Sequence, residues 1–170
     1  MKRTPAIAIS AIFAIIAPGT VAGIVPWWIS RWKLQPPFLH FYGFRVTGII
    51  LILASLPVLL DSFARFALQG IGTPALLLPT RHLVVTGLYR YIRNPMYVAV
   101  VGLIAGQALL LGNRTLLCYG MLVWLAFETF VILYEEPVLR RAYAAEYEEF
   151  CRNVPRWIPR LSAWNPPRSR

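Results

Sequence analysis

Long uncharged runs separated by short charged segments dominate the pattern of hydrophobic and polar positions along the chain. A helix needs about 20 apolar residues to cross a bilayer, and each of the four longest runs approaches or exceeds that length. The pattern therefore predicts four transmembrane helices, over residues 4–30, 38–60, 95–113 and 115–134. Arg45 lies near one end of the second run, where its long side chain can reach the membrane surface.

Two further segments are partly apolar but do not fit a membrane crossing. Residues 70–80 are too short and are broken by glycine and proline, so they predict a re-entrant or interfacial segment. We expect Pro137 to interrupt the helix, and the apolar spacing after it predicts a C-terminal amphipathic helix to about Cys151, on the cytoplasmic membrane surface. The predicted fold class is an all-α integral membrane protein, with residues 1–170 as a single domain.

Two of the predicted spans leave alternatives open. The first follows Lys2-Arg3 and contains Val21-Ala22-Gly23, a pattern that a cleavable signal peptide shares. In the third, Gly102 and Gly106 have the small-xxx-small spacing that lets either a neighbouring helix or a ligand approach the backbone closely. Only residues 112–114 connect the third and fourth spans, so these two helices should form an antiparallel hairpin.

Composition supports a membrane protein and excludes several other classes. Hydrophobic residues make up 58% of the 170 residues, charged residues make up 14%, and the mean hydropathy is +0.58, which is too apolar for a soluble domain. The net charge of +10 does not indicate nucleic-acid binding, because the basic residues flank the apolar runs and no basic patch with stacking aromatics lies outside such a flanking position. Cys118 and Cys151 lack the spacing of metal ligands or of a disulfide, so we expect no metal.

The basic residues also predict the orientation. With four spans, both termini and residues 65–93 lie on one side, and that side holds thirteen of the 17 Lys and Arg residues. Basic residues are enriched in cytoplasmic loops. We therefore expect a protein of a bacterial-type inner (cytoplasmic) membrane, with both termini in the cytoplasm and the lipid bilayer as its surroundings.

Residues 83–97 combine a glycine turn, tyrosines, arginines and the start of a helix. Asn94 followed by Pro95 is typical of an N-cap and a first helical residue. The free N–H groups of this helix end, together with Arg90 and Arg93, favour an anion such as a carboxylate or a phosphate. A capped membrane helix with interfacial Arg and Tyr side chains explains the same residues without a ligand.

Three acidic residues bear on the chemistry. Glu128 lies inside the fourth span, where a charge costs roughly 2 to 3 kcal/mol, and Glu135 follows two helical turns later on the same face. Either this face lines a polar cavity or Glu128 is a packed, hydrogen-bonded acid. Glu135 and Glu136 lie at a helix end whose dipole they oppose, so they require a cation, which Arg90, Arg93 or a cationic ligand would supply.

The sequence lacks the motifs of hydrolases, metal sites and phosphate-binding loops. The histidines are His40 and His82, and there is no Gly-x-Ser-x-Gly motif and no Gly-rich loop. What remains is a half-buried cytoplasmic site with an anion-binding helix end and carboxylates opposite it. A zwitterionic ligand with a carboxylate, an amine and ribose hydroxyls would satisfy both ends.

Several ordered segments resemble a known family. They are Thr73-Pro74 through Arg81, Leu-Val-Val-Thr-Gly-Leu-Tyr-Arg-Tyr-Ile-Arg-Asn-Pro-Met-Tyr at 83–97, Tyr134-Glu135-Glu136-Pro137, Glu146-Tyr147 and Arg152-Asn-Val-Pro-Arg156. Over about residues 72–160 they are similar to the isoprenylcysteine carboxyl methyltransferase family, whose broader group includes phospholipid N-methyltransferases and bacterial relatives. The resemblance implies S-adenosylmethionine as the cofactor at the cytoplasmic membrane face, and a lipidic acceptor that enters from the bilayer.

The resemblance also implies which residues contact the cofactor. Carried over position by position, they are Arg93, Asn94, Pro95, Tyr97, Glu135 and Glu136, flanked by His82, Val84, Gly87 and Tyr89. The sequence departs from the family twice: Asn94 replaces a histidine of the eukaryotic enzymes, and residues 130–134 lack the arginines that those enzymes carry before the glutamate pair. A prenylcysteine carboxylate buried in lipid requires such a cation, so the class of acceptor stays open.

Methyl transfer is an in-line displacement that depends on alignment of donor and acceptor in a water-poor site. A carboxylate acceptor needs no base, whereas an amine or a thiol must lose a proton. Glu128 is the intramembrane group placed to take that proton, and so is the predicted catalytic residue. The expected function is S-adenosylmethionine-dependent methyl transfer to a lipidic or small apolar acceptor. The alternative is a non-enzymatic membrane scaffold or transporter subunit.

The charge asymmetry generates a first test. In a variant without native cysteines, single cysteines at positions 114 and 169 should be labelled by a membrane-impermeant thiol reagent from opposite sides of the membrane. Labelling of both positions from the same side would contradict the predicted topology.

Overall fold

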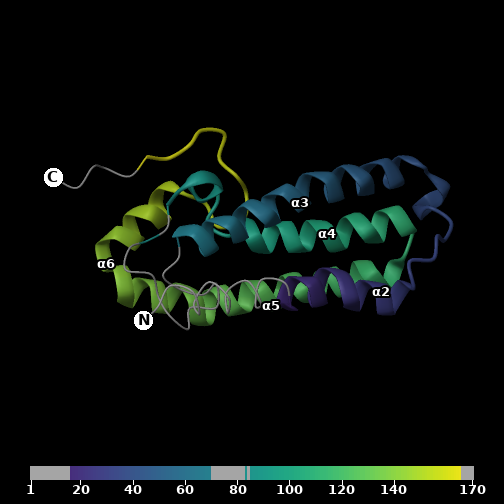
Figure 1. Ribbon diagram of the computed structural model, residues 1–170, viewed down its shortest axis with the longest axis horizontal. Helices are drawn as coiled ribbons and strands as arrows, with labels where there is room; N and C mark the ends of the chain where they lie inside the picture. The colour runs from purple at the N-terminus through teal and green to yellow at the C-terminus, as the bar shows by residue number, and fades with distance from the viewer. Residues whose placement is uncertain (1–15, 70–82, 84, 166–170) are drawn as a thin grey trace.

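The computed structural model describes residues 16–69, 83 and 85–165, and these ranges form helices and connecting segments without any strand (Figure 1). Two helical stretches are long and apolar enough to cross a membrane, Gly43–Arg65 and Arg114–Asn153, and two apolar helices are shorter, Ile16–Ser30 and Pro95–Leu111. The all-α prediction is therefore confirmed, with two candidate spans. Residues 4–15 of the first predicted span and the predicted segment at 70–80 lie outside the described residues.

Helix α3 (Gly43–Gln69) begins and ends later than the sequence predicts for the second span. It begins late because Leu39 and His40, in the short 3-10 turn Phe38–His40, have positive φ angles of 50° and 55°, which an α-helix does not accommodate. It continues past residue 60 because Asp61 and Arg65, one helical turn apart, form an ion pair within the helix. The Arg65 Nε atom donates to Asp61 Oδ2 at 2.7 Å.

Helices α3 and α4 (Pro95–Leu111) pack side by side through glycine positions (Figure 1). A Cβ atom added at Gly106 would lie 2.8 Å from the Gly48 carbonyl oxygen, and one at Gly102 would overlap the Ser55 hydroxyl. The small-xxx-small pair therefore serves helix packing, which decides between the two readings of that spacing. Ile104, on the same helix, is fully buried in the apolar core.

Helix α5 (Arg114–Phe130) follows α4 after a very short connection, as predicted for a hairpin. Gly112 adopts the left-handed conformation, with a φ of 69°, and ends α4. The Asn113 side chain then accepts a hydrogen bond of 3.0 Å from the Leu116 backbone N–H and caps the start of α5.

A π-helical turn precedes a proline twice in this fold, and each time the helix continues. The turns are Thr20–Ile24, before Pro26, and Val131–Glu135, before Pro137. Proline removes one backbone donor and its ring crowds the carbonyl one turn earlier, and a wider π turn relieves that contact. The expectation that Pro137 interrupts the helix is therefore wrong.

Helix α6 (Glu136–Asn153) continues directly from the second π turn. The backbone departs from helical geometry further along, at Ala144, where φ is 42° and ψ is −116°. Its placement along the membrane surface stays a prediction.

The first helix shows how freed backbone carbonyls are satisfied. The Val21 carbonyl accepts a hydrogen bond of 2.9 Å from the Tyr119 hydroxyl, and the Ala22 carbonyl accepts one of 2.7 Å from Gln107 Nε2. These donors come from α5 and α4, so side chains of neighbouring helices replace the bonds that Pro26 and the π turn remove. Helix α2 (Val25–Ser30), which follows the turn, is thereby tied to the bundle.

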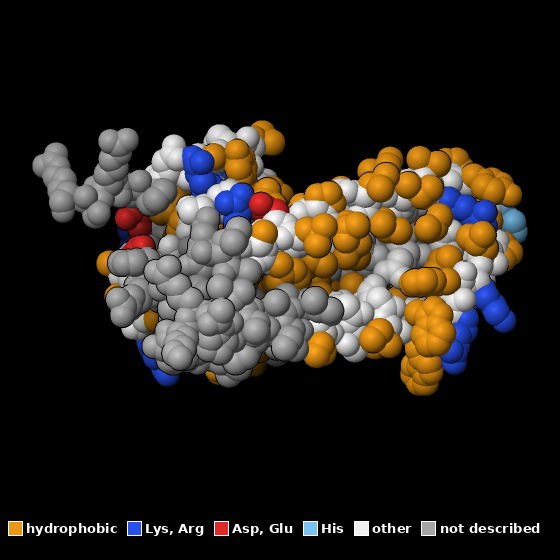
Figure 2. Space-filling view, viewed as in Figure 1, with side chains coloured by type: hydrophobic (Ala, Val, Ile, Leu, Met, Phe, Trp, Pro, Cys, Tyr) orange, Lys and Arg blue, Asp and Glu red, His pale blue; other side chains and the backbone are white. Residues whose placement is uncertain are grey.

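On the face shown in Figure 2, apolar side chains run along the length of the bundle, and Lys and Arg side chains gather toward its two ends. At one end lie the start of α4, the turn from α5 into α6 and the C-terminal segment 154–165 (Figure 1). We call this the acidic end, because Glu128, Glu135 and Glu136 lie there. The opposite end contains the hairpin at residues 112–113.

The close approach of α3 and α4 generates a second test. Gly106→Ala should lower the free energy of unfolding in detergent by about 1–3 kcal/mol, because the new methyl group meets backbone atoms that cannot move independently. Gly23→Ala is the matched control, since no atom lies within 4 Å of a Cβ added there. Equal stability of the two variants would show that the helices are not packed at Gly106.

Candidate functional site

The helix that starts the candidate site begins at Pro95, as the sequence predicts, but Asn94 does not cap it in the expected way. The Asn94 side chain accepts no bond from the first turn of α4. It is buried, and its Nδ2 atom donates to the Arg156 carbonyl at 3.4 Å. Asn94 therefore occupies the predicted N-cap position, but its side chain bonds to the C-terminal segment that passes beside it and not to the first turn of α4.

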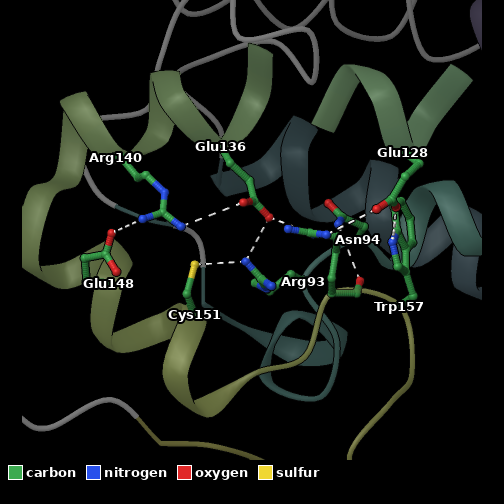
Figure 3. A network of polar contacts seen from close by, with 9 residues as sticks. Arg93, Asn94, Glu128, Glu136, Arg140, Glu148, Cys151 and Trp157 are labelled. Carbon is green, nitrogen blue, oxygen red and sulfur yellow. Dashed lines mark hydrogen bonds and ion pairs between the residues drawn. The ribbon is translucent and has the colours of Figure 1, made fainter. Parts of the chain in front are cut away.

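Glu136 is the centre of the site. Its carboxylate is 9% exposed, and its Oε1 atom accepts from Arg93 Nη1 at 3.1 Å and from Arg156 Nε at 2.8 Å (Figure 3). Arg140 Nη2 lies 3.9 Å from Oε2. The prediction that the glutamate pair requires a cation is confirmed for Glu136, with Arg93 as one partner. The Glu136 hydrogen bond raises the pKa of the Arg156 guanidinium above its usual value.

The two glutamates of the pair have different surroundings. Glu135 Oε2 accepts a hydrogen bond of 2.9 Å from the Tyr97 hydroxyl, and the Tyr97 ring stacks on Phe127 with centroids 4.6 Å apart. Among the described residues, Tyr97 is the hydrogen-bond partner of Glu135, and no arginine pairs with it. The Glu135 carboxylate therefore keeps acceptor capacity that Glu136 has used.

Glu128 shares its cation with Glu136. Its Oε1 atom accepts from Arg156 Nη1 at 3.2 Å, and its Oε2 atom accepts from the Trp157 indole N–H (Figure 3). The sequence pairs Glu128 with Glu135, seven residues on, whereas the structure brings it to the same guanidinium as Glu136, eight residues on. Two α-helical turns span about 7.2 residues, and the intervening π turn accommodates one more.

The C-terminal segment 154–165 lies along the loop that precedes α4. Its backbone makes three bonds to that loop: Arg93 N–H donates to the Pro155 carbonyl at 2.9 Å, Arg160 N–H to the Tyr91 carbonyl at 3.0 Å, and Trp164 N–H to the Arg90 carbonyl at 3.0 Å. Arg90 Nε in turn donates to the Trp164 carbonyl at 2.9 Å. Arg90 therefore holds this segment and not the glutamate pair.

Sequence reasoning missed Arg156 and Trp157 as members of the site. Both were missed because 63 residues separate Arg93 from Arg156 and no local pattern connects them. Two signals pointed toward them. Arg156 ends one of the segments that resemble a known family, and the charge of Glu128 cannot be neutralised by its own helix, which has no basic residue from 115 to 134.

Gly87 and Tyr89 lie beside the site, on the turn Gly87–Arg90. Gly87 has a φ of 55°, a left-handed conformation that favours glycine, and a Cβ atom there would displace the Arg65 guanidinium. Tyr89 is buried, and burial raises the pKa of its hydroxyl. His82 and Val84, the other two flanking residues predicted from the sequence, lie outside the described residues.

Comparisons with known proteins place these residues in a family context. A family model described as phospholipid methyltransferase matches residues 44–146. A curated protein-S-isoprenylcysteine O-methyltransferase of Schizosaccharomyces pombe is 35% identical over 80 residues, which is 46% of this chain and 34% of that protein. The match thus spans about a third of the relative's length. No solved structure matched the chain.

The double pairing of Glu136 generates a third test. Glu136→Gln keeps the shape of the side chain but leaves two guanidinium groups without their shared carboxylate, so the free energy of unfolding should fall by about 3 kcal/mol or more. Glu148→Gln is the control, because its pair with Arg140 is exposed and should contribute less than about 1 kcal/mol. Denaturant unfolding in mixed micelles measures the free energy of unfolding of both variants. A loss for Glu136→Gln no larger than for the control would contradict the central role of this carboxylate.

Proposed function

We propose, from the premise that this chain belongs to the phospholipid methyltransferase family, that it transfers a methyl group from S-adenosylmethionine to a lipidic or small apolar acceptor. The observation that carries the proposal is the meeting of the predicted contact residues at one end of the bundle. Arg93, Tyr97, Glu135 and Glu136 come from sequence positions up to 43 residues apart, and hydrogen bonds connect them in two pairs. All four lie within the matched residues.

The donors and acceptors of the site fit a zwitterionic cofactor. The Arg93 Nε atom is buried and has no partner among the described residues, so it remains a donor for a ligand carboxylate or ring nitrogen. The Glu135 carboxylate, with Tyr97 on one oxygen, is an acceptor for ligand hydroxyl or ammonium groups. We assign Glu135 to direct contact with the cofactor and Glu136 to holding Arg93 in place.

Of the remaining predicted contact residues, four are described by the structure and are assigned supporting roles. Asn94 and Pro95 set the start of α4 next to these donors, and Gly87 and Tyr89 support the preceding loop. His82 and Val84 stay predictions from the resemblance.

The cofactor, when bound, supplies a methyl group on a positively charged sulfur that leaves as a neutral thioether. The role of the protein in methyl transfer is to align the acceptor with the methyl donor and to keep water out of the site. A carboxylate acceptor attacks without losing a proton, whereas an amine or thiol must be deprotonated. Glu128 is the acid of α5 proposed for that step, and its bonds to Arg156 and Trp157 must loosen for it to act as a base. These bonds favour an acceptor that needs no base.

We place the site at the cytoplasmic face of a bacterial-type inner membrane. Eight described basic residues lie toward the acidic end and four toward the opposite end. The eight are Arg65, Arg90, Arg93, Arg140, Arg141, Arg152, Arg156 and Arg160, and the four are Arg31, Lys33, Arg45 and Arg114. This bias supports a cytoplasmic acidic end.

The assignment of Glu135 generates a fourth test. Calorimetry in detergent should show binding of S-adenosylmethionine to the protein, and Glu135→Gln should weaken it about tenfold or more, because a charge-assisted hydrogen bond is lost. The control is Glu149→Gln, an exposed residue of α6. Tritiated-methyl transfer to extracted lipids tests turnover. A protein that neither binds the cofactor nor transfers methyl groups would be a scaffold or transporter subunit.

Glu128 generates a fifth test, which separates the classes of acceptor. If the acceptor is an amine or a thiol, Glu128→Gln should reduce turnover without changing cofactor affinity, because the amide keeps the shape and loses the base. If the acceptor is a carboxylate, turnover should be kept or increased, since a repelling charge is removed. Joint loss of turnover and cofactor affinity would assign Glu128 a structural role only.

A further inference from the structure

The helix before the glutamate pair has no cation of its own, and the structure shows where one comes from. Residues 130–134 are Phe-Val-Ile-Leu-Tyr. Arg156 reaches the same region from the C-terminal segment, with its guanidinium between Glu128 and Glu136. Residue 156 lies beyond the stretch matched by the family model, which ends at residue 146. The family model therefore does not cover this cation, although Arg156 ends one of the sequence segments that resemble the family.

The guanidinium of Arg156 keeps donors for a ligand. Of its five N–H groups, one on Nε is directed to Glu136 at 2.8 Å and one on Nη1 to Glu128 at 3.2 Å. The Nη2 atom bonds to no described residue, and the side chain is 28% exposed. Trp157, the next residue, donates its indole N–H to Glu128.

Anchoring of the C-terminal segment does not by itself account for this arginine. The backbone of the segment already makes hydrogen bonds to the loop before α4, at Pro155, Arg160 and Trp164. Glu136 already has Arg93 as a partner at 3.1 Å. Arg156 is thus a second, partly exposed guanidinium at the same carboxylate, and its Nη2 atom has no partner among the described residues. Two carboxylates hold it in a fixed orientation, as expected for a group that binds a ligand.

We propose that Arg156 binds the oxyanion of the methyl acceptor through Nη2, and that the acceptor is an apolar chain bearing a carboxylate or a phosphate. The proposal rests on the proposed methyltransferase function. Two sources share this chemistry. In a prenylated cysteine the bound carboxylate is itself methylated, and in an aminophospholipid the bound phosphate places a neighbouring amine near the methyl donor. Glu128 and Glu136 then position the guanidinium and, in doing so, compete with the ligand for it.

The test measures binding of defined amphiphiles in a non-ionic detergent by calorimetry, without cofactor. The probes are N-acetyl-S-farnesylcysteine, which has a carboxylate, dioleoylphosphatidylethanolamine, which has a phosphate and an amine, and dodecylamine, which has no oxyanion. Arg156→Gln should weaken binding of at least one of the first two probes about tenfold, and should leave dodecylamine and S-adenosylmethionine unaffected. The probe that loses affinity identifies the source.

Further variants keep the test decisive if Arg156→Gln does not fold. Arg156→Lys retains the charge without the planar fork, so it should give an intermediate loss. Glu128→Gln removes a competitor and should tighten oxyanion binding, but not in combination with Arg156→Gln, as a double-mutant cycle would show. Arg160→Gln, in the same segment, is the control that should not change probe binding, because its side chain donates to the Asn153 carbonyl.

The outcomes separate this proposal from the proposed function. Equal loss of all probes, dodecylamine included, or no change in any of them, would overturn the role of Arg156. Absence of S-adenosylmethionine binding by the unaltered protein would overturn the proposed function. In that case the oxyanion measurements still decide whether Arg156 is a binding group.

Discussion

The buried carboxylate of Glu136 is the contact on which the acidic end of the molecule depends. It joins the loop before α4, through Arg93, to the C-terminal segment, through Arg156, and it does so from the first residue of α6. Two guanidinium groups on one oxygen are stable only while the carboxylate keeps its charge. Three segments that are distant in the chain are thus held by one ionised group, and the positions of Tyr97 and Glu135 follow from that arrangement.

Local patterns predicted the features whose causes are local. The start of α4 at Pro95 and the short hairpin at Gly112 each depend on residues within one or two turns of one another. The partner of Glu136 was predictable because few cations were available near the glutamate pair. Arg156 was not, because its role follows from a backbone path that places residues 154–165 against the loop before α4, and no periodicity encodes such a path. For the same reason the sequence did not predict that the Asn94 side chain, at the predicted N-cap position, bonds to this segment.

The error at Pro137 has a different origin. The rule that proline ends or bends a helix assumes that every backbone hydrogen bond joins residues i and i−4. A single π turn before the proline instead removes the clash between the proline ring and the carbonyl one turn earlier, and the helix continues. The same solution appears before Pro26, where side chains from α4 and α5 bond to the freed carbonyls. The turn before Pro137 also advances the register by one residue. Glu136, not Glu135, therefore meets the cation of Glu128, and Glu135 is left to Tyr97.

The position of Arg156 in the chain has a consequence for how the protein is made. Synthesis runs from the N-terminus, so α5 emerges from the ribosome before the segment that neutralises Glu128. On the prediction that α5 spans the membrane, Glu128 would enter the lipid phase without its counterion, at a cost of roughly 2 to 3 kcal/mol if charged, unless it enters as the neutral acid. The remainder of α5, which carries no other acidic residue, is apolar enough to outweigh that cost. The acidic end is thus completed only when the last segment, which is synthesised after α5, folds back against it.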